Sequence, residues 1–399
     1  MEVKEIVEFL KSRPGYKREG ARRLAIKVLK GKATEEDCRE ALQIVNDTVK
    51  KVDVEDFNPY KDKKLINEPE LKLKSRWQSA SGEWLESYRA VPNEETTLTK
   101  EDIEEAVLKA IEKSNLETTL IDPVEVKTSK SMLVWTSDKH IGADTTGSQH
   151  DKPYNKAVFV RRMEVLALSI LMKSDEVGGL DSLVIADLGD ATDGQDGYTS
   201  SRSHRLPQNM TNREVFETYI ETHIGFIDTL IENEVATNYE FWFNTNSNHG
   251  GSYEYACHKA FQLYIETKYP QVKVKSFDKF MGHTEFKGVT YLLTHGKDDS
   301  NRKFGLPLYP DPKTEVFIDN YLKMNRLSLN ENIRLIKGDL HQSASVPCKN
   351  INRYRNVASM FGSSGWVMDN FGYTPPGTDY EILDEFTGEI MEGTFWYTE

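Results

Sequence analysis

The sequence of 399 residues has few cysteines and no long apolar run. Its three cysteines are far apart and form no CxxC pair, which argues against a disulfide framework and a zinc knuckle and favours a reducing compartment. The longest apolar stretch, at 165–172, is too short to span a bilayer. The N-terminus is charged from Glu2 onward and lacks the apolar run of a secretion signal. We therefore expect a cytoplasmic protein that does not contact membranes.

The sequence also lacks an excess of positive charge. Its net charge of -13 at pH 7 argues against nucleic acid coating the whole surface, although a local basic patch or a metal-assisted site remains compatible with it. Apolar residues make up 38% and charged residues 29% of the chain, which is typical of a folded globular protein. The length accommodates a large catalytic domain and an appendage.

Residues 1–50 are predicted to form a small helical unit. Helices are expected near residues 3–11 and 17–29 and after Thr34, which has the cap-forming residue Asp37 three positions on. A helix pair with a basic face is typical of a helix-turn-helix that contacts DNA phosphates, but also of a plain helical bundle. The second helix carries Arg18, Arg22 and Arg23.

Residues 51–130 are predicted to be a linker with two small elements. Residues 53–74 are polar and show no clear period. Residues 77–88 place aromatic residues around a Ser-Gly pair, which predicts a hairpin whose aromatic side chains form a mini-core rather than a base-stacking surface. Residues 99–113 have the apolar stripe of an amphipathic helix.

From residue 131 onward, short β-rich runs alternate with long amphipathic helices. This alternation predicts an α/β sheet covered by helices. Helices are expected near residues 155–173, 211–233 and 252–269, and the tail from Asn356 to Trp396 is strand-like with glycine-rich turns. The predicted strands are MLVWTS, SLVIADL, YEFWFNT, VTYLLT and NIRLIK.

Potential metal ligands follow directly after each of these five strands. Binding sites in α/β sheets form beyond the carboxyl ends of the strands, so polar residues there are the candidates for chemistry. Each position alone is typical of an ordinary loop, but five in succession combine imidazole with oxygen donors, as divalent metals prefer. In chain order the candidates are Asp138 and His140, Asp190 and Asp193, Asn248 and His249, His295, and Asp339 and His341.

The motif order Asp-x-His, Gly-Asp-x-x-Asp, Asn-His, His-Gly and Gly-x-x-His resembles the calcineurin-like metallophosphoesterase superfamily over residues 131–399. Within it, the chain is more similar to phage or bacterial phosphodiesterases and SbcD-type repair nucleases than to phosphoprotein phosphatases. The resemblance implies an α/β fold, a four-layer β-sandwich flanked by helices, beside the small helical N-terminal appendage. For a phage-encoded chain, the expected location is the host cytoplasm.

The resemblance also implies a role for each motif residue. His249 is similar to the acid that protonates the leaving oxygen, and Asp193 is expected to accept a hydrogen bond from it. Two divalent ions are expected, with Mn²⁺ favoured over Mg²⁺, Zn²⁺ or Fe. The implied ligands are Asp138, His140 and His341 for the first ion, Asn248 and His295 for the second, and Asp190 between the two.

Three departures from the family pattern stand out. Asp339 replaces a histidine that ligates the second metal; a carboxylate suits Mn²⁺ or Mg²⁺, and the alternative is that Asp339 faces away from the site. Ser247 and Gly250 flank the Asn-His pair where the family usually has a glycine and an acid. Gly194 stands where phosphoprotein phosphatases carry a phosphate-binding arginine, which argues against a phosphoprotein phosphatase.

Two polar segments are predicted to surround the metals. A long loop at 195–210 follows the second motif, and another segment at 297–303 follows His295; long loops in compact domains are often functional. Their basic residues are either phosphate contacts or plain surface charges. The candidate substrate-binding residues are Arg202, His204, Arg205, Arg302 and Lys303.

We therefore expect a two-metal phosphodiester hydrolase, with DNA as its substrate and an exo- or endonuclease of phage-like repair or recombination type as its concrete form. The first alternative is a small-molecule nucleotide phosphodiesterase or phosphatase, because a fold does not determine a substrate. The second is a non-catalytic scaffold, for which Asp339 is the only support. The sequence does not indicate an oligomeric state.

Overall fold

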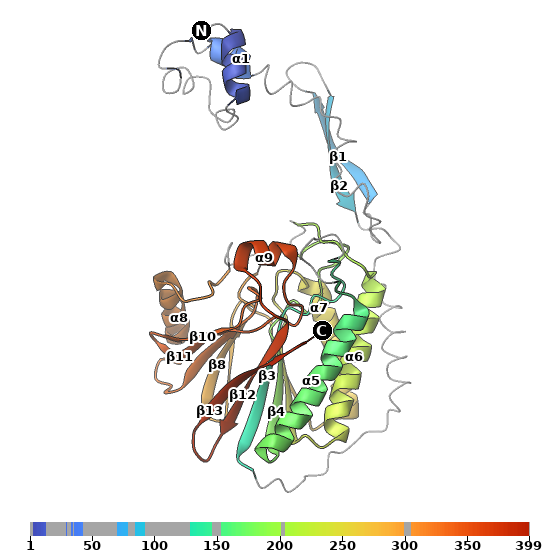
Figure 1. Ribbon diagram of the computed structural model, residues 1–399, viewed down its shortest axis with the longest axis vertical. Coiled ribbons are helices and arrows are strands. Elements are labelled where there is room, and N and C mark those ends of the chain that lie inside the picture. The colour runs from blue at the N-terminus through green and yellow to red at the C-terminus, as the bar shows by residue number, and fades with distance from the viewer. Residues whose placement is uncertain are drawn as a thin grey trace. The chain divides into compact units, whose positions relative to one another are not determined.

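A computed structural model of the chain describes residues 3–12, 29, 33–34, 36–42, 70–78, 84–91, 128–145, 153–200, 204–298 and 305–398, with the backbone alone at 70–78 and 84–91. The chain divides into two compact units, Met1–Lys64 and Leu65–Glu399. Figure 1 shows the helices and strands of each unit.

The first unit contains helix α1 (Val3–Ser12) and a second helical segment at 36–42. Thr34 and Asp37 cap that segment reciprocally, since the Asp37 N–H donates to the Thr34 hydroxyl and the Thr34 N–H donates to the Asp37 carboxylate. Both predicted helices are confirmed. The predicted helix at 17–29 and its arginines lie outside the described residues, apart from Leu29. The buried apolar cluster of this unit consists of Ile6, Val7, Leu10, Leu29, Cys38 and Ala41.

Strands β1 (Glu70–Gln78) and β2 (Trp84–Val91) form an antiparallel hairpin. The hairpin expected at 77–88 is confirmed, but its first strand begins at Glu70, within the stretch predicted as linker. The register shifts between Leu73 and Ser75, and such an irregularity hides the alternation by which a strand is recognised. The expected aromatic mini-core and the helix at 99–113 lie outside what the structure describes.

Two sheets form the centre of the second unit. The order of the first sheet is β13-β12-β3-β4-β5-β6, and that of the second is β10-β11-β9-β8-β7. The first sheet contains β3 (Lys130–Thr136), β4 (Leu180–Asp187), β5 (Ala236–Asn244), β6 (Lys273–Phe277), β12 (Gly377–Asp384) and β13 (Ile390–Trp396). The second contains β7 (Gly282–Phe286), β8 (Val289–Thr294), β9 (Ile333–Lys337), β10 (Ala344–Cys348) and β11 (Ile351–Asn356).

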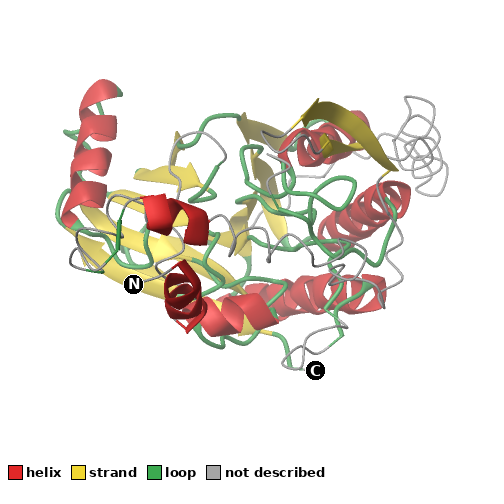
Figure 2. Ribbon diagram, turned by 90° about the horizontal axis from the view of Figure 1, so that it is seen from above, coloured by secondary structure: helices red, strands yellow, loops and turns green. Residues whose placement is uncertain are grey.

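The parallel strands place the predicted motifs at a common edge. Strands β3, β4, β5 and β6 run parallel in one sheet, and β8, β9 and β11 run parallel in the other. Each of the five motifs begins just after the end of β3, β4, β5, β8 or β9. The loops that follow these strands, green in Figure 2, are seen from above in that view.

Three long helices follow the strands of the first sheet, as the alternation predicts. They are α5 (Lys156–Val177), α6 (Asn212–Glu232) and α7 (Gly251–Lys268). Asn155 caps α5 through its side chain, and Thr211 with Glu214 forms a capping box on α6. Two shorter helices are α8 (Pro312–Met324) and α9 (Gly365–Phe371). None of the helices within the described ranges is long and apolar enough to cross a membrane.

The faces of each central strand pack into different cores. In β3, Leu133 and Trp135 point into the core between the two sheets, whereas Met132 and Val134 point toward the helices. Both faces are therefore buried, which explains the continuous apolar run. Trp135 lies against Trp242 of β5 and Tyr291 of β8, with ring centroids 6.1 and 5.2 Å away. These aromatic contacts join the sheets.

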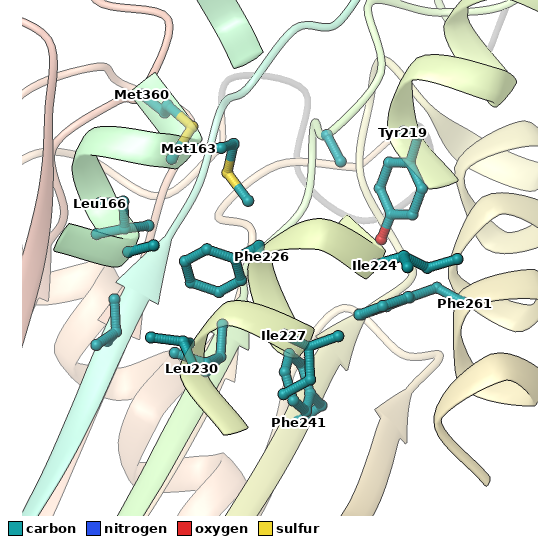
Figure 3. Packing of buried hydrophobic residues seen from close by; sticks show 14 of the residues in the cluster. Met163, Leu166, Tyr219, Ile224, Phe226, Ile227, Leu230, Phe241, Phe261 and Met360 are labelled. Carbon is teal, nitrogen blue, oxygen red and sulfur yellow. The ribbon is translucent and has the colours of Figure 1, made fainter. Parts of the chain in front are cut away.

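Helices cover the outer face of each sheet. Side chains of α5, α6 and α7 pack on the first sheet, where Met163, Phe226, Phe261 and Phe241 meet in one cluster (Figure 3). On the second sheet, Ile318 and Leu322 of α8 pack against residues of β8, β9 and β11. The order of layers is helices, sheet, sheet, helix. The predicted α/β sandwich of four layers is confirmed.

Several short elements were not predicted. Strands β6 and β10 and helix α9 are short and carry weak periodic patterns, so residue spacing alone does not reveal them. The tail expected to be strand-like contains α9 between β11 and β12. Helix α8 does have a readable start, because Asp311 caps it and Pro312 occupies its first turn.

A buried ionic network also joins the sheets. Arg355 of β11 contacts Asp379 and Glu381 of β12 at 3.2 and 3.4 Å. Arg334 of β9 contacts Glu381 at 2.8 Å, and the Tyr291 hydroxyl donates to the same carboxylate. Asp379 and Glu381 are fully buried. Each charge therefore depends on its partner across the sandwich.

Replacing Arg355 by Met should lower the free energy of unfolding by about 3–5 kcal/mol, because two buried carboxylates lose their partner. Urea denaturation followed by circular dichroism measures this. The control is Lys323→Met, which removes the exposed pair between Lys323 and Asp319 and should cost less than about 1 kcal/mol. Equal losses for both variants would show that the network does not join the sheets energetically.

Candidate metal centre

Five of the nine candidate residues adopt backbone conformations that non-glycine residues rarely adopt. Among the described residues with positive φ are Asp138, His140, Asp190, Asp339 and His341, with φ between 45° and 74°. Such conformations cost energy and gather at functional sites. Asp138 and His140 are therefore not part of an extended strand, although both side chains face the same site.

One group of side chains contains Asp138, His140 and His341. The His341 Nε2 lies 3.3 Å from the Asp138 Oδ1 and 3.2 Å from the His140 Nε2. The His140 Nε2 lies 3.9 Å from the same Asp138 oxygen. All three residues are buried, and their spacing is close enough to hold a metal ion.

A second group contains Asp138, Asp190 and His295. The His295 Nε2 lies 3.0 Å from the Asp190 Oδ2 and 4.0 Å from the Asp339 Oδ1. Asp339 therefore faces this group, and the alternative in which it points away is not what the structure contains. Asp138 belongs to both groups. The sequence resemblance instead implies that Asp190 is the residue shared by the two sites.

In His140, His341 and His295, the ring nitrogen that points away from the site already has a hydrogen-bond partner. The Nδ1 of His140 donates to the Asp193 carboxylate at 2.8 Å, and the Nδ1 of His341 donates to the Gly362 carbonyl at 2.7 Å. The Nδ1 of His295 faces the Leu188 carbonyl at 3.1 Å. Carbonyl and carboxylate oxygens only accept, so in a neutral ring each Nε2 presents a lone pair to the site.

This arrangement fits a cation. In the neutral rings, the lone pairs of His140 and His341 face each other, and that of His295 faces Asp190; without a positive charge among them these contacts are repulsive. The Nε2 of His295, the Oδ1 of Asp138 and the Oδ1 of Asn248 are buried and have no hydrogen-bond partner within the described chain. Buried polar atoms without partners are costly, and coordination to a metal would satisfy them.

The pKa shifts of His295 and Asp138 also show that the site favours positive charge beside its carboxylates. Burial alone would lower the pKa of His295, but Asp190 overcomes burial and raises that pKa to about 10. Burial alone would raise the pKa of Asp138, but His341 holds it below its usual value. A field that favours a proton on His295 also favours a metal cation beside it.

His249 lies beside the two groups and is held by Asp193. The Nδ1 of His249 lies 3.1 Å from the Asp193 Oδ1, the contact predicted from the sequence. Asp193 also bonds to His140, which was not predicted. Burial alone would lower the pKa of His249, but Asp190 and Asp193 raise it to about 9. These two histidines and Asp193 are also close enough to form a third metal-holding group.

The loop that follows the second motif is hydrogen-bonded to the third motif, the Asn-His pair. Both the N–H and the hydroxyl of Ser200 donate to the Asn248 carbonyl, at 3.2 and 2.9 Å. The loop expected at 195–210 therefore lies next to the candidate ligands. His204 is exposed and Arg205 is half-buried. Arg202, Arg302 and Lys303 lie outside the described residues.

A cavity of about 470 Å³ is lined by Ser247 and Gly250, on either side of the Asn-His pair in the chain, but by none of the nine candidate residues. It is lined mainly by neutral polar side chains from the loops after β4 and β5 and from the start of α7, and Asp278 after β6 adds one acidic side chain. Tyr255 is the aromatic residue on its wall. Side chains that line it include Gln195, Thr199, Ser200, Asn246 and Ser247.

Several residues that shape the site lack a sequence signal. The Leu188 and Gly362 carbonyls hold histidines, but backbone groups leave no mark in a sequence. Glu254 accepts a hydrogen bond from the Ala191 N–H next to Asp190, although it looks like an ordinary acid in the first turn of α7. His283 lies in β7 and contacts the Tyr321 hydroxyl, outside the three metal-holding groups.

No protein family model and no curated protein matches the chain. Solved structures to which it is similar include a Danio rerio dimetal phosphatase (9% identity, TM-score 0.32, 67% of this chain and 99% of that one). A purple acid phosphatase from yellow lupin, Lupinus luteus, has 10% identity and a TM-score of 0.32, over 69% of this chain and 55% of the lupin chain. A Staphylococcus aureus protein assigned as a 5′-nucleotidase has 10% identity and a TM-score of 0.30, over 68% and 55%. At these TM-scores, the similarities assign no activity to the chain.

Replacing Asp190 by Asn should remove both ions, because the family resemblance implies that Asp190 lies between the two sites and serves both. Elemental analysis after dialysis against Mn²⁺ measures the ions bound per chain, with Asp319→Asn on the exposed face of α8 as the control. A variant that keeps one ion per chain would place Asp190 at one site alone and leave Asp138 as the bridge.

Proposed function

We propose that residues 131–399 form a two-metal phosphoester hydrolase of the calcineurin-like type. The observation that supports this best is the convergence of three imidazole Nε2 atoms on buried carboxylates while each Nδ1 is already held. Protons on His295 and His341 would satisfy some of these contacts, but they leave the buried Oδ1 of Asn248 without a hydrogen-bond partner within the described chain. Two metal ions would satisfy the imidazoles, the carboxylates and this oxygen together.

The two ions would be held by different sets of residues. When bound, they act as Lewis acids on a phosphoryl group and lower the pKa of water. The carboxylates suit Mn²⁺ or Mg²⁺, and the imidazoles also accept Zn²⁺ or Fe; we propose Mn²⁺. The ligands are Asp138, His140 and His341 at the first site and Asn248, His295 and Asp339 at the second, with Asp190 between them.

His249 is proposed as the general acid. Asp193 holds its Nδ1, so that the Nε2 is available to protonate the oxygen that leaves phosphorus. The His249 side chain is 20% exposed, whereas those of His140 and His295 are 5% and 0% exposed. A proton donor must reach the substrate, and His249 is the more accessible of these imidazoles.

We propose a phosphodiester as the substrate class and DNA as the substrate. The support comes from the basic residues expected around the metals, from the attachment of the loop at 195–210 to Asn248, and from the absence of an arginine at Gly194. The helical N-terminal unit is proposed to contact DNA.

A small nucleotide is the second candidate substrate. The cavity beside Ser247 supports it, since a largely neutral polar lining with one aromatic ring and the acid Asp278 suits a sugar and a base better than a long polyanion. The inactive scaffold is less well supported, because Asp339 faces His295 and its carboxylate is compatible with ligation.

Replacing His249 by Gln should lower kcat by about 10²- to 10⁴-fold, the usual loss when a general acid is removed. Mn²⁺ content should stay near the wild-type value, because the proposed acid is not a ligand. Steady-state kinetics and elemental analysis of the same preparation measure both, with His283→Gln as the control. Loss of metal from the His249 variant would contradict this role.

Incubation of the Mn²⁺-loaded protein with labelled single- and double-stranded DNA tests the substrate. We expect cleavage that Asp190→Asn abolishes and that deletion of residues 1–50 weakens. Parallel reactions contain bis-p-nitrophenyl phosphate and cyclic nucleotides. Turnover of these small diesters without DNA cleavage, unchanged by the deletion, would favour the nucleotide phosphodiesterase.

A further inference from the structure

Glu254 occupies the space that a side chain at position 250 would fill. A Cβ atom built on Gly250 would lie 2.1 Å from the Glu254 Oε2 and 2.4 Å from the Glu254 Cβ. These distances are too short for both side chains to be present. Gly250 has φ of -73° and ψ of -43°, a backbone conformation open to any residue, so the glycine is required by the contact with Glu254.

The Glu254 carboxylate connects two loops of the candidate metal centre. Its Oε2 accepts a hydrogen bond from the Ala191 N–H at 2.9 Å, and the Thr192 N–H lies at 3.5 Å. The Ser247 hydroxyl lies 3.4 Å from the same oxygen. Ala191 directly follows Asp190, and Ser247 directly precedes Asn248. One carboxylate oxygen therefore contacts both loops.

Glu254 is fully buried, and such a position is costly for an acid. The side chain is absent from the three metal-holding groups. Its contacts also differ from those of a helix cap, because they go to other loops and not to the first turn of α7. Its contacts to Ala191 and Ser247 hold the two loops in register.

We propose that Glu254 is the positioning residue of the metal centre. It takes the place of the acid that the sequence resemblance leads one to expect at position 250, although it lies four residues later in the chain. It fixes the turn that carries Asp190 against the turn that carries Asn248. This inference rests on the proposed two-metal site and concerns its assembly. It makes Gly250 and Glu254 a reciprocal pair, in which one position carries the acid and the other must be small.

Two variants of similar volume separate hydrogen bonding from packing. Glu254→Gln keeps an accepting oxygen, whereas Glu254→Met fills the space without one. We expect Glu254→Met to weaken Mn²⁺ binding by about 10- to 100-fold, the usual effect of losing a group that orients ligands, and Glu254→Gln to stay near wild type. Isothermal titration calorimetry with Mn²⁺ measures the Kd, and Glu266→Met on the exposed face of α7 is the control.

Exchanging the two residues tests the reciprocal relation. Glu254→Gly alone should weaken Mn²⁺ binding, and adding Gly250→Asp to it should recover the affinity, since the carboxylate returns to the same space. Melting temperatures of the metal-free proteins report the fold separately. Equal Mn²⁺ affinity of the Gln and Met variants, or no recovery in the exchanged protein, would overturn the proposal. A wild-type protein that binds no Mn²⁺ would overturn the metal centre itself, and with it the role of Glu254.

Discussion

The repulsion among buried acidic side chains is the constraint on which the site depends. Asp138 and Asp190 are almost fully excluded from solvent, and Asp339 faces the same group as Asp190. Charges in a medium of low dielectric interact strongly, so the carboxylates require compensation. The neighbouring imidazoles supply it when they carry protons, and divalent cations would supply it better because they satisfy the histidine lone pairs as well.

The arrangement of the two sheets brings these side chains together. Residues after β3, β4 and β5 come from one sheet, and residues after β8 and β9 come from the other. The aromatic contacts of Trp135 and the ionic contacts of Arg355 hold the sheets together. Asp379 also accepts a hydrogen bond from the Ala358 N–H, in the loop whose Gly362 carbonyl orients His341. The contacts between the sheets therefore also support the loop that orients His341.

The supporting contacts around the site are made largely by backbone groups and by residues distant in sequence. Carbonyls of Leu188 and Gly362 set the orientation of two imidazoles, and the N–H of His249 donates to Asp190. Asp193 contacts two histidines that lie 109 positions apart in the chain, since it bonds to both His140 and His249. Glu254 adds a side-chain contact of the same kind. Such groups position ligands without binding the substrate.

The sequence by itself determined the strands of the metal motifs, their alternation with the long helices, and the nine polar residues at the strand ends. It could do so because apolar periodicity is local and because strand ends in parallel sheets share an edge. Tertiary structure decided which oxygens meet which nitrogens. It placed Asp138 in both groups, turned Asp339 toward His295, and put the Glu254 carboxylate in the space beside Gly250. These outcomes depend on left-handed backbone turns and on contacts between loops far apart in the chain, and neither is encoded in local spacing.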